Sequence, residues 1–148
     1  MLTSIPQFER FFRAAASLDI DKEDLRRYHG FLDRRIYDLM IRAQAAAKAN
    51  ARDIIHPHDL PITRGLQERI HEFRTLDAGI DLKSVLKDTV KHPMVDLDYD
   101  DETRDALPEI AGALTVALAR SFRIVDPELK NPMTWHWDRV FALFDLLL

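Results

Sequence analysis

Residues 25–47 have the sequence LRRYHGFLDRRIYDLMIRAQAAA, and this stretch decides the fold. Its apolar positions recur every three or four residues, at Leu25, Tyr28, Leu32, Ile36, Leu39, Met40, Ala43, Ala46 and Ala47. At about 3.6 residues per turn they form one stripe along a helix. The spacing therefore predicts a long amphipathic helix with Leu32 and Ile36 at the centre of its buried face. Phe31 lies off this stripe.

Shorter helices are expected on both sides of the long one. Apolar residues at the same spacing predict a first helix between residues 5 and 18, and Asp21 is suited to cap the helix that follows. Ile54 and Ile55 predict a brief extended piece. Because Pro57 disfavours helix just before it, we expect Asp59 to cap a third helix.

The same short–long–short order returns in the second half. Asp81 is expected to cap a short helix, and residues 94–99 alternate as an extended linker does. A second long helix runs to about Val125. Either it starts near Asp105, which places Pro108 in its first turn, or it starts near Asp101 and kinks at Pro108. Thr134 is expected to cap a last helix with inward-facing side chains at Val140, Phe144 and Leu147.

An isolated unit of about 70 residues cannot cover both sides of its long central helix, so two such units have to pair. The sequence thus predicts an all-α chain in which residues 1–76 and residues 77–148 form two tandem units around one core. In effect, the chain is expected to be an intramolecular pseudo-dimer, and further association between chains stays open.

Composition argues against three classes of protein: those that coat DNA, those with disulfides and those that span a membrane. The 148 residues carry a formal charge of −4, which divides into +2 for residues 1–76 and −6 for residues 77–148. Proteins that coat DNA without sequence preference depend on net positive charge, which this chain lacks. It contains no Cys, which excludes disulfides and thiolate chemistry. Since no apolar run approaches the ~20 residues of a membrane span, and no signal peptide is recognised, we expect a cytoplasmic protein that binds no membrane.

Two segments of the first half resemble archaeal histones. Ile5-Pro-Gln-Phe-Glu-Arg-Phe-Phe-Arg-Ala-Ala matches the opening helix of that family, and Arg52-Asp-Ile-Ile-His-Pro-His-Asp-Leu resembles its second loop. The second half resembles the fold only in outline. Taken whole, the chain is similar to a bacterial family of single-chain doubled histone folds of unknown function. The resemblance implies a histone fold in both units, with Arg52 and Asp59 forming a structural pair across the loop.

The resemblance also implies candidate positions for contact with DNA. Arg10 and Arg13 match basic positions of the first histone helix, Arg52 matches the loop arginine, and Arg26 and Arg27 belong to an arginine-rich helix face. Several departures oppose that role. Asp53 replaces a lysine, Ile54 replaces a threonine, and the corresponding loop of the second half, residues 96–102, is strongly acidic and would repel phosphate. We therefore expect no nucleosome-like wrapping.

Other candidate chemistry has a simpler explanation in each case. His56, His58 and Asp59 could bind zinc. The two histidines alone are a weak signal because the sequence does not place a third ligand with them, and a loop before a capped helix needs no metal. Trp135 and Trp137 could stack on bases, although aromatics that begin a terminal helix are more often core residues. No phosphate loop or nucleophile motif is present. We expect no cofactor and no enzyme activity.

Three functions stay open at this point. The first is a histone-like protein associated with DNA through its basic first half, or a dimerisation and interaction module, with a place on the nucleoid if DNA is bound. The second is a pure protein–protein interaction module that binds no DNA. The third is a metal protein built on His56, His58 and Asp59.

Overall fold

Helices make up nearly all the regular structure in residues 5–148, the part of the chain that the computed structural model describes. The elements, in chain order, are α1 (Ile5–Ala16), α2 (Lys22–Ala49), β1 (Ile54–Ile55), the 3-10 turn η2 (Pro57–Asp59), α3 (Arg64–Asp77), α4 (Leu82–Thr89), β2 (Asp98–Tyr99), α5 (Asp101–Val125) and α6 (Thr134–Leu147). The expectation of a mostly helical chain is confirmed. Within residues 5–148, no helix combines the length and apolar character needed to cross a membrane.

The long helix predicted from residues 25–47 is α2. Asp21 caps it, since its carboxylate accepts from the Asp24 backbone N–H at 2.9 Å while the Asp24 carboxylate accepts from the Asp21 N–H, also at 2.9 Å. These two bonds satisfy donors that a helix start leaves free. Leu32 and Ile36 are buried at 3% and 1% exposure, as the stripe predicts.

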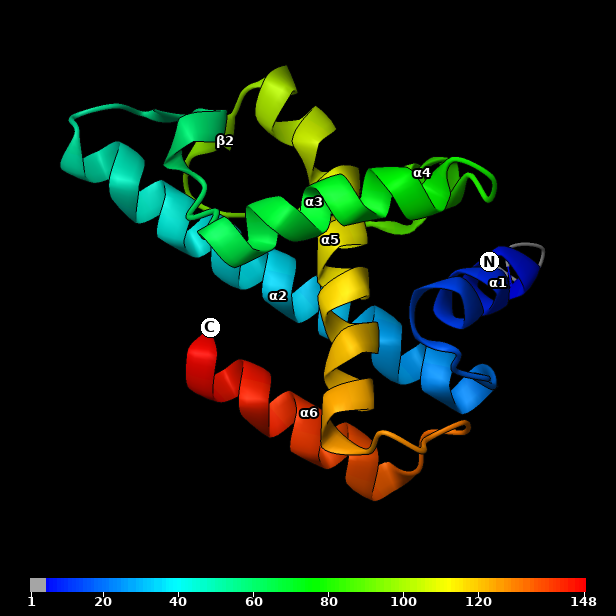
Figure 1. Ribbon diagram of the computed structural model, residues 1–148. Coiled ribbons are helices and arrows are strands. Elements are labelled where there is room, and N and C mark those ends of the chain that lie inside the picture. The colour runs from blue at the N-terminus through cyan, green and yellow to red at the C-terminus, as the bar shows by residue number, and fades with distance from the viewer. Residues whose placement is uncertain (1–4) are drawn as a thin grey trace.

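Helix α5 lies at the centre of the molecule, with α2, α3 and α6 around it (Figure 1). Asp100 caps it by accepting from the Thr103 N–H at 2.8 Å, so the helix starts at Asp101 and contains Pro108 in its interior. Every residue from Ile110 to Val116 is buried. Gly112 allows α3 to pack closely against α5, because a Cβ there would stand 2.5 Å from the ring of Phe73 in α3.

Hydrogen bonds join segments of the first half to segments of the second half at many places, and three of these contacts mark the middle and the two ends of α2. Where α2 crosses α5, the Tyr28 hydroxyl lies 2.7 Å from Thr115 Oγ1 in the buried core. At one end of α2, β1 pairs with β2 in parallel. At its other end, the Asp19 N–H donates to the Lys130 carbonyl oxygen at 2.8 Å. The two halves therefore share one core and are joined at both ends of it.

Three predicted helix caps were placed on the wrong residue. Thr63, and not Asp59, caps α3, accepting from the Leu66 N–H at 3.1 Å. Asp59 lies in the preceding 3-10 turn, where its carboxylate is held by Arg52. Pro61 disfavours a helical conformation at the residue before it, so α3 cannot continue directly from the 3-10 turn. The helix begins later, and the first suitable carboxylate in the sequence is not its cap.

At the other two helix starts, too, the cap bond is made by a residue other than the one predicted. At α4, Asp81 has a left-handed backbone (φ 61°), and its side chain makes no cap bond. The Asp77 carboxylate accepts from the Leu82 N–H at 2.6 Å instead. At α6, the His136 ring nitrogen Nδ1 accepts from the Met133 N–H at 2.9 Å, which leaves Thr134 as the first helical residue.

The packing of α6 differs from the sequence prediction at two side chains. Leu147 does not face inward, because its side chain is 78% exposed at the end of α6. Phe31 is 4% exposed although it lies off the main stripe of α2. It packs against Phe141 and Phe144 of α6, with ring centroids 5.8 Å and 4.8 Å apart. Helix α2 thus buries a second face that its main stripe does not include.

Leu32→Ala should lower the free energy of unfolding by on the order of 2–5 kcal/mol, because a buried leucine is truncated where helices meet on all sides. Urea denaturation followed by circular dichroism measures the change. Ile41→Ala is the control, since Ile41 lies on α2 with 36% exposure and should cost much less. Equal, small losses at both positions would show that the assignment of the buried face is wrong.

Candidate functional site

The loops at the β1–β2 end bring together several of the residues singled out in the sequence. Arg52 and Asp59 form a two-point ion pair, with Nη1 to Oδ2 at 2.7 Å and Nη2 to Oδ1 at 2.5 Å. The Asp59 side chain is only 2% exposed and also accepts from the His56 backbone N–H at 2.9 Å. Bonds from the Arg52 guanidinium are the main reason why the pKa of Asp59 lies far below its usual value. This pair closes the turn between α2 and α3.

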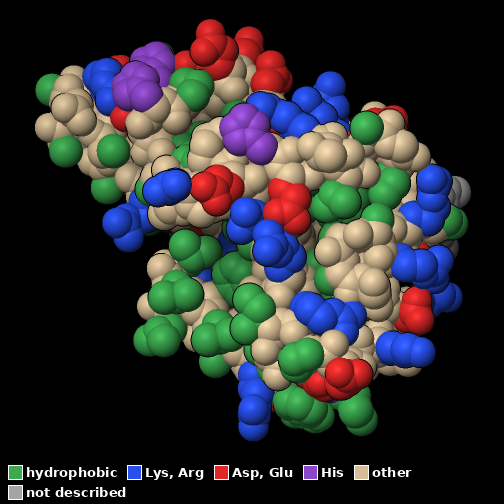
Figure 2. Space-filling view, in the orientation of Figure 1, with side chains coloured by type: hydrophobic (Ala, Val, Ile, Leu, Met, Phe, Trp, Pro, Cys, Tyr) green, Lys and Arg blue, Asp and Glu red, His purple; other side chains and the backbone are tan. Residues whose placement is uncertain are grey.

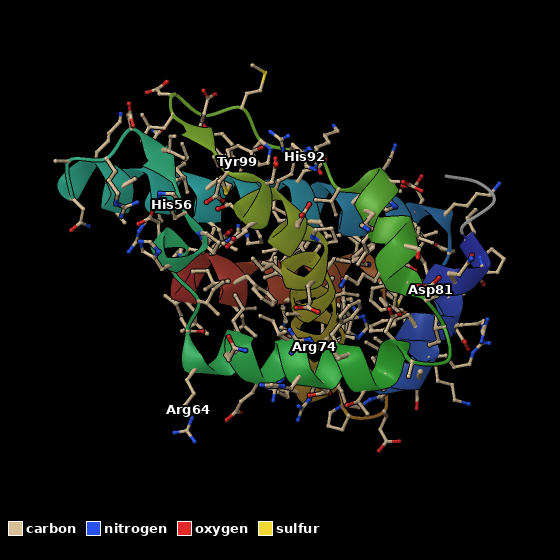
Figure 3. The ribbon with its side chains drawn as sticks, turned by 90° about the horizontal axis from the view of Figure 1, so that it is seen from above. His56, Arg64, Arg74, Asp81, His92 and Tyr99 are labelled. Carbon is tan, nitrogen blue, oxygen red and sulfur yellow. The ribbon has the colours of Figure 1, made fainter. Side chains whose placement is uncertain are left out.

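His56 joins that turn to the start of α5. Its Nδ1 lies 2.6 Å from Asp100 Oδ2, and Asp100 also accepts from the Thr103 hydroxyl at 2.6 Å. The Thr103 bond, helped by His56, lowers the pKa of the Asp100 carboxyl. Figure 3 shows His56 and Tyr99 on the neighbouring segments that meet here. The carboxylates at this end are therefore engaged in closing and capping the backbone.

The three metal candidates do not converge on one point. His56 faces Asp100, Asp59 is held by Arg52, and His58 is an exposed ring whose Nε2 stays 3.8 Å from Asp59. Among residues 5–148, no group of three or more His, Cys, Asp or Glu side chains could hold a metal ion. The geometry of this loop gives the metal hypothesis no further support.

Each of the five predicted DNA-contacting arginines has a partner within the chain. The contacts are Arg10 with the Gly79 carbonyl oxygen at 3.1 Å, Arg13 with Asp19 at 3.2 Å, Arg26 with Glu23 at 2.6 Å, Arg27 with the Thr134 hydroxyl at 3.2 Å, and Arg52 with Asp59. The four arginines of α1 and α2 lie near the start of α2, whereas Arg52 follows its other end, about 40 Å away along a helix of 28 residues. They do not form one basic patch.

The surface around Arg52 is acidic. Asp96 and Asp98 are exposed beside it, and Asp96 lies 3.6 Å from Lys48, the one lysine at this end of α2. Figure 2 shows acidic side chains gathered along the upper edge of the face, over β2 and the start of α5. A phosphate backbone approaching Arg52 would meet these carboxylates first.

An apolar groove lies between α3, α5 and α6, on the side of the molecule that holds the C-terminal end. It has a volume of about 540 Å³, and its apolar lining includes Leu66, Leu114, Ala117, Ile124, Leu143 and Leu147. A narrower hollow of about 160 Å³ shares Leu66, Leu114 and Leu147 and extends it toward α2. In Figure 2 the hydrophobic side chains gather over this end of α6.

Exposed apolar side chains border the groove. Ile124 and Leu147 are each 78% exposed, Leu146 is 79% exposed, and Leu143 is 40% exposed. Arg69 and Arg120 stand at its edge and share Glu72, at 3.1 Å and 2.8 Å. Clustered exposed leucines with a charged border are typical of surfaces that bind another macromolecule.

A family model described as a domain of unknown function, DUF1931, matches residues 8–145. The chain belongs to the DUF1931 family. This DUF1931 protein is similar, at 49% identity, to a Thermus thermophilus protein of known crystal structure; the match covers 100% of both chains with a TM-score of 0.86. An Aquifex aeolicus protein, solved at 1.9 Å, shares the fold at 21% identity, with a TM-score of 0.85 over 98% of this chain and 95% of that one. An uncharacterized protein of Aquifex aeolicus strain VF5 is 23% identical over 124 residues, 84% of this chain and 72% of its own length.

Two polar contacts of this DUF1931 protein escaped sequence reasoning. The buried Trp137 indole N–H donates to Asp24 Oδ1 at 2.7 Å, which ties the start of α2 to α6. The His136 ring nitrogen Nε2 lies 3.0 Å from Asp126, and its bond lowers the pKa of that carboxyl. Asp24 stands three residues after a capping Asp21, so its capping role was visible in the sequence. Its second partner, 113 positions away, was not.

Acid should destabilise this protein through the Arg52–Asp59 pair. Because the folded pKa of Asp59 lies below its unfolded value, the charged carboxylate contributes stability above about pH 4, and that contribution is lost as the pH falls further. Asp59→Asn should lower the free energy of unfolding at pH 7 by on the order of 1–3 kcal/mol and flatten the loss between about pH 5 and pH 3. Urea titrations at these pH values measure both effects.

The control is Asp53→Asn, which changes an exposed carboxylate of the same loop. It should leave the acid dependence nearly unchanged. If both variants followed the same pH curve as the parent chain, the buried pair would not be a source of stability.

Proposed function

We propose that this protein is a histone-fold pseudo-dimer, with residues 1–76 and residues 77–148 as its two units. Support comes from the crossing of α2 and α5 at Tyr28 and Thr115, which are the long helices of the two proposed units. Further support comes from the loops, since the second loop of each unit bonds to the first loop of the other through β1–β2 and through Asp19–Lys130. This reciprocal exchange is what a head-to-tail pair of like units requires.

The proposed role is non-enzymatic and consists of association with other protein chains, within the cytoplasm. The observation that carries it is the apolar groove between α3, α5 and α6, together with the exposed leucines beside it. The polar residues at the β1–β2 end are bound to one another in turns and caps, as Arg52–Asp59 and His56–Asp100 illustrate. The groove has a volume of about 540 Å³, and its lining suits an apolar partner.

The partner that fits this groove best is a second copy of the chain. The exposed edge of α6 is a ridge in which Leu143 and Leu147 form one wall of the groove and Leu146 lies exposed next to them. A twofold axis through the boundary would place the ridge of each copy in the groove of the other.

Duplex DNA receives less support from the geometry. Arg13, Arg26 and Arg52 already bond to carboxylates of the same chain. Breaking these ion pairs to contact phosphate would cancel part of the electrostatic free energy that the phosphate contacts provide. The loop that a histone-like protein would turn toward DNA in the second unit carries Asp96, Asp98 and Asp100.

Leu147→Glu should convert a dimer into a single chain. In the proposed dimer, the glutamate carboxylate would be buried in an apolar interface without water, which is costly. The stability of the isolated chain should not change, since Leu147 is 78% exposed there. Sedimentation equilibrium across a range of concentrations measures the association, and thermal unfolding of the variant at low concentration checks its folding. Met94→Glu, at a side chain that is 93% exposed on the linker before β2, is the control and should remain a dimer.

Two outcomes would contradict the role proposed for the groove. One is a parent chain that sediments as a single copy at every concentration. The other is equal weakening of association by Leu147→Glu and Met94→Glu, which would show that added negative charge, and not the groove, is responsible.

A titration with a fluorescent DNA duplex separates this role from the histone-like one. We expect weak binding that disappears at moderate salt and that the double variant Arg10→Ala, Arg13→Ala leaves unchanged, because neither arginine is free of contacts within the chain. Tight binding that persists at moderate salt and is lost in the double variant would favour the DNA-associated role instead.

A further inference from the structure

Helices α2 and α6 lie side by side and run in the same direction. Arg27 contacts Thr134 at the start of α6, Phe31 stacks on Phe141 further along both helices, and Arg35 contacts Asp145 near the end of α6. Between the helices lies a cleft of about 190 Å³, which shares no lining residue with the apolar groove itself and shares Arg35 with the narrower hollow that extends it. It is lined by Arg27, Gly30, Phe31, Arg34, Arg35 and Phe141.

Three arginines of one helix face turn toward this cleft. They occupy positions i, i+7 and i+8, which fall on the same side of a helix. Arg27 bonds to a hydroxyl, the Thr134 Oγ1, and Arg34 makes neither a hydrogen bond nor an ion pair with the described part of the chain. Neither guanidinium has a carboxylate partner there, so the mouth of the cleft carries positive charge that its immediate surroundings do not neutralise.

Arg35 supplies a buried donor. Its side chain is only 7% exposed, and Nη2 is held by Asp145 at 2.6 Å. Its Nε atom is buried and has no hydrogen-bond partner within residues 5–148. A buried guanidinium N–H without a partner is costly, so the hydrogen bonds within the described chain do not fully satisfy the arginine that stands beside the cleft. This is an observation independent of the charge at the mouth.

Gly30 has no packing role. It lies inside a helix of 28 residues, where glycine costs about 1 kcal/mol relative to alanine. A Cβ added there would meet nothing within 4 Å, and its φ is not in the left-handed region. Gly112 in α5 is the contrast, because a Cβ there would strike Phe73. The absence of a side chain at residue 30 therefore serves no contact in the fold and leaves one wall of the cleft open.

We propose that the cleft between α2 and α6 binds the phosphate group of a small molecule. Planar guanidinium groups donate in pairs to phosphate oxygens, and the three arginines present that chemistry around a hollow with Phe31 and Phe141 as apolar walls. A single phosphate suits the cleft better than a duplex does. Asp38 and Asp145 flank Arg35, so the basic area is confined to the hollow and does not extend over a surface.

An amide-resolved NMR titration tests the proposal on the whole chain. Sodium phosphate is added to the labelled protein and compared with sodium chloride at the same ionic strength. We expect saturable shifts at Gly30, Phe31 and Arg34 with phosphate and none with chloride. Phosphate should also raise the melting temperature, because a ligand that binds only the folded chain stabilises it.

Two variants and a matched control locate the site. Arg34→Gln should weaken phosphate binding roughly tenfold, since it removes a charged two-point donor. Arg64→Gln makes the same change of charge at a side chain on α3 that is 93% exposed and points away from the molecule (Figure 3), so it should leave binding unchanged. Gly30→Leu places a side chain in the open wall and should abolish binding without lowering the melting temperature, because leucine favours helix more than glycine does.

The proposal fails if the phosphate shifts grow linearly without saturating or match those of chloride. It also fails if Arg34→Gln and Arg64→Gln weaken binding equally, which would reveal a general charge effect. A fluorescent DNA duplex provides the last arm: binding of the duplex that depends on Arg34, with no saturable binding of free phosphate, would assign the arginines to nucleic acid and overturn the small-molecule site.

Discussion

Helix α5 is apolar around nearly its whole circumference, and it can leave water only when other helices enclose it. All residues from Ile110 to Val116 are buried, including two positions, Gly112 and Thr115, that are small enough for close approach. Helix α3 covers one side at Phe73, and α2 crosses another at Tyr28. Because α2 and α3 belong to the first half of the chain, the second half cannot bury its own central helix. Each half depends on the other for its core.

This mutual enclosure fixes where the polar residues lie. The crossing of α2 and α5 brings the loops of the two halves together in pairs, and each pair is then closed by local bonds: Arg52–Asp59 and His56–Asp100 at one end, His136–Asp126 at the other. Enclosure is incomplete at the end of α6, and the leucines exposed there border the apolar groove. The surface proposed for association thus consists of apolar side chains that this packing leaves uncovered.

The sequence was informative wherever a feature is local. The stripe of α2, its cap at Asp21 and the extended pieces at β1 and β2 follow from residues close to one another in the chain, and the structure contains all of them. Caps were misplaced where two candidates compete within a few residues: the Arg52–Asp59 pair that the histone resemblance implies is present, and it occupies the carboxylate, so Thr63 caps α3 in place of Asp59. The groove and the arginine cleft could not be predicted, since both arise between helices that are far apart in the sequence. The burial of Phe31 and the exposure of Leu147 have the same cause, the position of α6.

Native-state hydrogen exchange tests the central claim, that the two halves form one core, most directly. Amides in the middle of α2, around Leu32 and Ile36, and amides in the middle of α5, around Leu114, should open with the same free energy, equal to that of global unfolding. They should also lose stability together as denaturant is added. If α2 exchanged by a separate and cheaper opening while α5 stayed protected, each half would be a folding unit of its own, and the account of a shared core would be wrong.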